Sequence, residues 1–187
     1  MLSHALDDDD PWLGTIAKFP TVLHARASLV YDVTNETLQK TLIHCLLQLK
    51  QSIRPIELSL SDNAGYLDGT VSFRVGVGSN DGFDILDASE EDRFLRRILA
   101  HGVFQTLDLS FDLKYKVKSS RRHRVARDRY LTRLTFQTSR AELLVHHLKG
   151  LKRIDPGEMV RLLLEITNAE LTSKGYGEIA IEESRTN

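Results

Sequence analysis

The chain has 187 residues, of which 41% are hydrophobic and 27% are charged, with a formal net charge of −1. This composition is typical of a globular protein rather than a disordered chain, and the length suits one domain. The single cysteine, Cys45, excludes an internal disulfide, and no apolar run approaches the roughly 20 residues that cross a bilayer as a helix. We therefore expect a soluble protein without a membrane partner.

The N-terminal residues predict a flexible acidic leader over residues 1–20. Four aspartates, Asp7 to Asp10, precede Pro11 in this stretch. The basic start and apolar middle of a signal peptide are both missing, so we expect a cytoplasmic location. Residues 21–187 then form a single α+β domain.

The first half of that domain predicts three strands and a helix. Residues 21–32 alternate apolar and polar side chains, which indicates a strand, and residues 35–51 follow helical spacing behind the N-cap residue Thr34. Two further strands are expected at about 55–60 and 67–79. The glycines at 76, 78 and 82 favour a turn over a phosphate loop, because no helix begins there and no Gly-Lys-Ser/Thr follows.

The second half continues the mixed pattern. We expect a helix over 88–101 behind Asp87, and strands over about 105–118 and 129–138. Residues 140–149 fit either a helix or a strand. Asp155, Pro156 and Glu158 give a strong helix start, which predicts a helix to about 173 and a short final strand after it.

The order over residues 21–118 is β-α-β-β-α-β, which is that of a ferredoxin-like arrangement. It predicts an antiparallel sheet in which the first strand lies between the third and the fourth. The full fold class is then an α+β domain with a ferredoxin-like N-terminal part, a long basic β-hairpin and a helical C-terminal extension.

The near-neutral net charge conceals a basic segment over residues 114–133. This segment holds nine Lys or Arg residues and one acid, Asp128, which gives 9 − 1 = +8 and leaves 16 − 25 = −9 for the rest of the chain. Lysine and arginine concentrated in one segment indicate an anionic partner, and arginine can meet phosphate oxygens in a bidentate geometry.

We therefore predict a non-enzymatic binding module that acts through this basic β-hairpin on an acidic protein surface or a nucleic-acid backbone. No stacking aromatics of an RNA-recognition sheet are found in the strand at 67–79, so nucleic-acid contact would be made to the backbone. The candidate binding residues are Lys114, Lys116, Lys118, Arg121, Arg122, Arg124, Arg127 and Arg129.

Two other functions remain open. In a ferredoxin-like order His24 would lie beside Asp108 and Asp112, which could form a small enzyme with His24 as general base, although a ladder of cross-strand ion pairs explains the same residues. A self-assembling structural subunit, and hence a homo-oligomer, would also use the acid–base asymmetry. The histidine and cysteine spacings do not match a metal site, and no motif indicates a cofactor.

Overall fold

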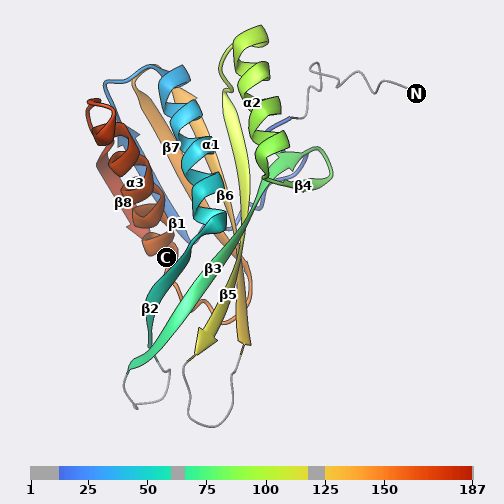
Figure 1. Ribbon diagram of the computed structural model, residues 1–187, viewed down its shortest axis with the longest axis vertical. Helices are drawn as coiled ribbons and strands as arrows, with labels where there is room; N and C mark the ends of the chain where they lie inside the picture. The colour runs from blue at the N-terminus through green and yellow to red at the C-terminus, as the bar shows by residue number, and fades with distance from the viewer. Residues whose placement is uncertain (1–12, 60–65, 118–124, 187) are drawn as a thin grey trace.

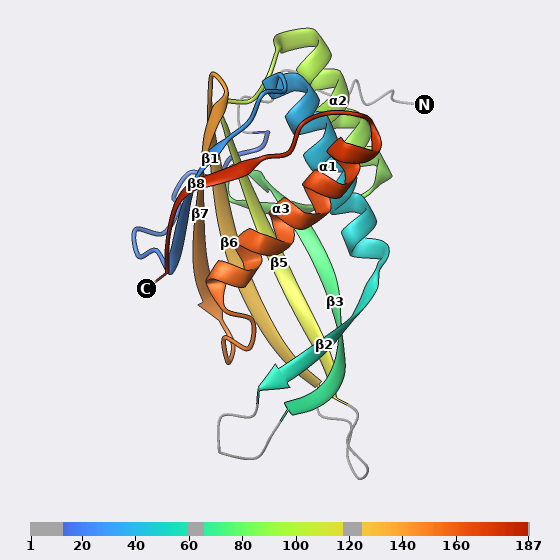
Figure 2. The same ribbon diagram turned by 90° about the vertical axis from the view of Figure 1, so that its left-hand side faces the viewer.

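The computed structural model describes residues 13–59, 66–117 and 125–186, and these form one eight-stranded antiparallel sheet with three helices. The helices lie on one side of the sheet (Figures 1 and 2). The α+β class and the antiparallel sheet are thus confirmed. The strands are Ala25–Val30 (β1), Ile53–Ser59 (β2), Tyr66–Ser79 (β3), Gly82–Ile85 (β4), Thr106–Val117 (β5), Val125–Gln137 (β6), Arg140–Lys149 (β7) and Ala180–Thr186 (β8).

The strand order differs from the ferredoxin-like expectation. The order is β2-β3-β5-β6-β7-β1-β8, with β4 paired to β3. β3 pairs directly with β5, while β1 pairs with β7 and β8. The first strand therefore does not lie between the third and the fourth. β3 occupies the edge of β5 where β1 was expected, and β6 and β7 follow on the other edge of β5, so β1 comes after them.

The helices α1 (Asn35–Gln51), α2 (Ala88–His101) and α3 (Pro156–Ser173) begin where the sequence predicts. The side chains of Thr34, Asp87 and Asp155 each accept a hydrogen bond from a backbone N–H of the first turn. These N-caps satisfy donors that the helix itself leaves unpaired. The three helices bury leucine, isoleucine, phenylalanine and methionine side chains against the sheet.

The C-terminal third is less helical than expected. Residues 140–149, whose pattern allowed a helix or a strand, form the strand β7, and the last strand β8 adds to β1. A tight reversal between β6 and β7 places Ser139 at φ +58°. The expected helical extension is therefore reduced to α3, because β7 and β8 are integral to the sheet.

The face of the sheet that the helices do not cover is called here the open face. At one end of it, residues 13–17 cross β3, where the N–H of Gly14 donates to the carbonyl of Gly78. A Cβ atom on Gly78 would lie 2.8 Å from the carbonyl carbon of Thr15, so the chain can cross so closely only at a glycine. Gly76 and Gly78 therefore lie within a strand, and only the residues after them form the expected turn.

Those same residues 13–17 belong to the stretch that the sequence assigned to the leader. Leu13 is buried, and the N–H of Ala17 donates to the carbonyl of Asn80. Residues 1–12, with the four aspartates, lie outside the described residues. Within the described part of the chain, no helix has the length and apolarity needed to cross a membrane.

Candidate anion-binding surface

Basic side chains gather on the open face where β3, β5 and β6 run side by side. The strand register sets Arg74, Asp112 and Arg129 in one cross-strand row, and Ser72, Lys114 and Arg127 in the next. Residues directly opposite each other in an antiparallel pair share a face. We call the set Arg74, Lys114, Lys116, Arg127 and Arg129 the basic surface; all five are exposed.

One cation of the basic surface is neutralised by a carboxylate. Arg129 makes a bidentate pair with Asp112, in which Nε donates to Oδ1 and Nη2 donates to Oδ2 at 2.9 Å. These hydrogen bonds raise the pKa of Arg129 above its ordinary value. No ion pair among the described residues includes Arg74, Lys114, Lys116 or Arg127. The basic surface therefore carries four cations without a carboxylate partner in the described part of the chain.

Lys114 and Arg127 are directly opposite each other, as Cα partners in the β5–β6 ladder. Like charges at such positions repel and destabilise the strand pair. A protein under selection for stability alone would place a carboxylate or a neutral side chain at one of the two positions. This arrangement suits an anion bound from outside.

The other end of the same two strands is organised differently. Asp108 is fully buried and forms two hydrogen bonds of 2.7 Å with Arg133, whose side chain is 27% exposed. The N–H of Ile16 also donates to Asp108, at 2.9 Å, and the Arg133 guanidinium lies over the Phe19 ring, 4.6 Å from its centroid. Here the charges are paired and the chain itself covers them.

Two grooves run along the uncovered part of the open face. One, of about 300 Å³, is lined by Ser72, Arg74, Asp112, Lys114, Arg127 and Arg129 among others. The second, of about 270 Å³, shares Arg74, Asp112 and Arg129 with the first. It continues to the apolar side chains of Phe83, Ile85, Leu131 and Leu148, which we call the apolar groove. Basic and apolar surfaces are thus continuous.

Half of the predicted binding residues can be located. Lys114, Lys116, Arg127 and Arg129 lie together on the open face. Lys118, Arg121, Arg122 and Arg124 fall in residues 118–124, outside the described residues, and their assignment stays a prediction.

The expected grouping of His24 with Asp108 and Asp112 is not formed. It depended on the ferredoxin-like order, whereas β6 and β7 here lie between β5 and β1. Asp108 and Asp112 instead pair with Arg133 and Arg129, and Arg26 pairs with Glu142. Asp108 and Asp112 thus form cross-strand ion pairs, which is the simpler of the two explanations given for these residues.

His24 lies beside His146 and His147, near the C-terminal end of β7. Its Nδ1 accepts a hydrogen bond of 3.0 Å from the N–H of His147, and its ring centroid is 5.1 Å from that of His146. Burial, followed by the nearby His146, Lys152 and His147, lowers the pKa of His24. No group of three or more His, Cys, Asp or Glu side chains in the described ranges has the geometry to hold a metal ion.

A buried carboxylate, that of Asp128 on β6, forms hydrogen bonds on the helix side of the sheet. Asp128 accepts hydrogen bonds of 2.9 Å from the Tyr115 hydroxyl and from the N–H groups of Lys152 and Arg153. Burial and the adjacent carboxylate raise the pKa of Tyr115, so its hydroxyl stays a donor. Asp128, the one acid of the basic segment, therefore anchors the loop after β7 and does not neutralise the basic surface.

The sequence does not reveal Arg74 as a member of the basic surface, and it does not reveal the apolar groove. Arg74 lies on β3, outside the basic segment of residues 114–133, and only the strand order brings it beside that segment. Phe83 lies on β4, a strand that the glycines concealed, and Leu148 follows a register shift between β6 and β7. The Phe-Asp-Ile stretch after Gly82 was the available signal for a short strand.

Comparison with known proteins assigns neither a family nor a function. No protein-family model matches the sequence, no curated protein matches it, and no solved structure matches the fold. Function therefore has to be inferred from the geometry of this chain.

Proposed function

We propose that this protein is a non-enzymatic binding module that holds an anionic macromolecule against the basic surface of β3, β5 and β6. The observation that carries the proposal is the direct pairing of Lys114 with Arg127, with no carboxylate of the described residues beside them. An anion bound there removes the repulsion between the two cations and gains charge-assisted hydrogen bonds. The predicted partners are an acidic protein surface or a nucleic-acid backbone.

The position of the basic surface supports the proposal. The ends of β3, β5 and β6 project beyond the helices, so a long partner can approach the open face there (Figures 1 and 2). Lysine and arginine on successive same-face positions of β5 and β6 are about 6.8 Å apart along each strand, twice the rise per residue. A regular row of cations at that spacing suits a polymer with regularly repeated negative charges.

Fluorescence polarisation against labelled duplex DNA, single-stranded RNA and polyglutamate, at low and physiological salt, tests this function. We expect salt-sensitive binding to at least one of these polyanions. The double variant Lys114→Ala/Arg127→Ala should weaken it about tenfold, and should lower the slope of log affinity against log salt by about 1 to 2.

The matched control removes the same amount of charge elsewhere. Lys40→Ala/Arg161→Ala takes two cations from the helix side, the half-buried Lys40 of α1 and the exposed Arg161 of α3. It should leave affinity within about twofold of the parent. Equal losses in the two double variants, or no binding at low salt, would overturn the proposal.

A further inference from the structure

The groove along the basic surface and the groove that leads to the apolar side chains have three lining residues in common, and this continuity bears on the kind of anion that binds. Arg74, Asp112 and Arg129 line both grooves. On one side of them lie Lys114 and Arg127, which pair with no carboxylate of the described residues. On the other side lie Phe83 and Leu148. A ligand that fills the whole trough needs repeated negative charges along one edge and apolar surface along the other.

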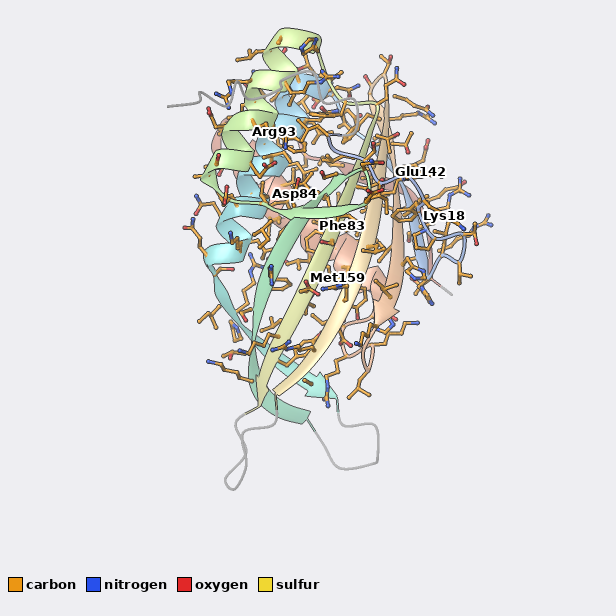
Figure 3. The ribbon with its side chains drawn as sticks, turned by 90° about the vertical axis from the view of Figure 1, so that its right-hand side faces the viewer. Lys18, Phe83, Asp84, Arg93, Glu142 and Met159 are labelled. Atoms are coloured by element: carbon orange, nitrogen blue, oxygen red, sulfur yellow. The ribbon has the colours of Figure 1, made fainter. Side chains whose placement is uncertain are left out.

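The apolar side chains are incompletely buried, although they border a charged surface. Ile85 is 42% exposed and Leu148 is 48% exposed, while Leu131 between them forms a buried floor. Phe83 on β4 lies beside the strands of the open face, whereas Met159 lies on the helix side (Figure 3). Large apolar side chains left accessible in a groove are typical of binding sites.

From this continuity, and resting on the proposed function, we infer that the partner is a single-stranded nucleic acid: its phosphates meet the basic surface and an unstacked base enters the apolar groove against Phe83. A phenylalanine ring offers a planar face to any base, and such stacking tolerates all four bases. The guanidinium groups of Arg74 and Arg127, which no carboxylate of the described residues engages, match phosphate oxygens.

A duplex fits this arrangement less well than a single strand. The bases of a duplex are stacked and paired, so only its phosphates could reach the trough and Phe83 would gain no contact. An acidic protein could meet the cations and place an apolar side chain in the groove. Its apolar side chain, however, would in general not be a flat ring, whereas every nucleotide brings a planar base next to its phosphate charge.

The test compares an oligonucleotide with an otherwise identical abasic strand that keeps the sugar and phosphate groups. Affinities are measured by fluorescence polarisation for the parent, Phe83→Ala, Phe83→Tyr and Leu148→Ala. We expect Phe83→Ala to weaken binding of the normal strand about tenfold and to leave the abasic strand unchanged. Phe83→Tyr should retain parent affinity because it keeps an aromatic face.

Leu148→Ala keeps the test decisive if removal of the Phe83 ring unfolds β4. It should weaken the normal strand by a smaller factor than Phe83→Ala and leave the abasic strand unchanged. The matched apolar control is Leu99→Ala, which removes a 70% exposed leucine from α2 and should change neither affinity.

The outcomes separate this inference from the proposed function. Equal binding of normal and abasic strands, or tighter binding of duplex DNA or polyglutamate than of the single strand, would overturn the inference and leave the binding module intact. Absence of binding to every polyanion would overturn the proposed function as well.

Discussion

The charged side chains are paired at one end of the β5–β6 hairpin and lack a partner of opposite charge among the described residues at the other end. At one end Asp108 is wholly buried and engages Arg133 with both oxygens, while the chain itself covers the pair. At the other end Lys114 and Arg127 face each other, exposed and without a carboxylate in the described part of the chain. The same two strands thus carry one surface whose charges are balanced within the chain and one whose positive charges are not balanced by the described residues.

This difference separates the end of the hairpin that stabilises the fold from the end that we propose binds an anion. The buried carboxylate of Asp108 holds the segment before β1 against the sheet, and loss of the Arg133 guanidinium would leave its charge buried and uncompensated. An exposed like-charge pair does the opposite, since it stores repulsion that a bound anion can relieve. The following experiments test whether the two ends are as different as their contacts indicate.

The largest effect is expected at Asp108. Asp108→Asn removes the negative charge that Arg133 and the Ile16 N–H share, and should lower the free energy of unfolding by about 3 kcal/mol. Urea denaturation measures it. The control Asp112→Asn breaks the pair with Arg129. Because the Arg129 and Asp112 side chains are 49% and 35% exposed, this variant should lower the free energy of unfolding by less than about 1 kcal/mol. Similar losses for the two variants would remove the contrast.

A nearly equal loss is expected at Gly150, on the helix side of the exposed end. Gly150 has φ +113°, and a Cβ atom there would lie 2.0 Å from Oδ1 of Asp128. Gly150→Ala should therefore lower the free energy of unfolding by about 2 to 3 kcal/mol, through backbone strain and displacement of the buried carboxylate. Thermal unfolding checks it. Gly175→Ala is the control, since Gly175 has φ +79° but open space around its Cα. If Gly175→Ala loses as much stability as Gly150→Ala, backbone conformation rather than the Asp128 contact explains the effect.

A gain in stability is expected at Lys114. Lys114→Glu turns the like-charge pair with Arg127 into an opposite-charge pair, and should raise the free energy of unfolding by about 0.5 kcal/mol at low salt while weakening anion binding. Denaturation in low and high salt measures it, because screening should remove most of the gain. A variant that loses both stability and binding would mean that Lys114 supports the fold.

The smallest effect concerns His24, which lies away from both ends. Its pKa is lowered in the folded protein, chiefly by burial and then by His146. The unfolded chain therefore takes up a proton first, and stability should fall as the pH drops below about 6.5. Melting temperatures between neutral and mildly acidic pH should show a shallower decline for His24→Gln than for the parent. Identical pH profiles would show that His24 does not contribute.

The sequence predicts the elements of this fold much better than their order. Local signals determine α1 and α3, because N-caps and helical spacing lie within the segments themselves. The alternation that identifies β1 says which of its faces is buried and nothing about its neighbours. Those neighbours are β7 and β8, one of them in a stretch whose pattern fitted helix and strand equally.

The part of the candidate site that lies on β5 and β6 was predictable, because side chains alternate between the two faces of a strand. Lys114 and Lys116 share a face of β5 by period two, and Arg127 and Arg129 do so on β6. The apolar groove was not predictable, because it joins Phe83 of a four-residue strand to Leu148 of β7, and only the sheet order brings those two strands to the same trough.

The place of β1 between β7 and β8 has a consequence for how the chain can fold. Ala25 pairs with Val145 on one side and with Thr186 on the other, so the first strand depends on partners from the far end of the sequence. Pairing between residues so far apart in the sequence slows folding, because the entropy cost of closing the long loop comes before the strand contacts stabilise the chain. During synthesis from the N-terminus, β1 waits unpaired until β7 has emerged, whereas the β5–β6 hairpin can form from adjacent residues well before that.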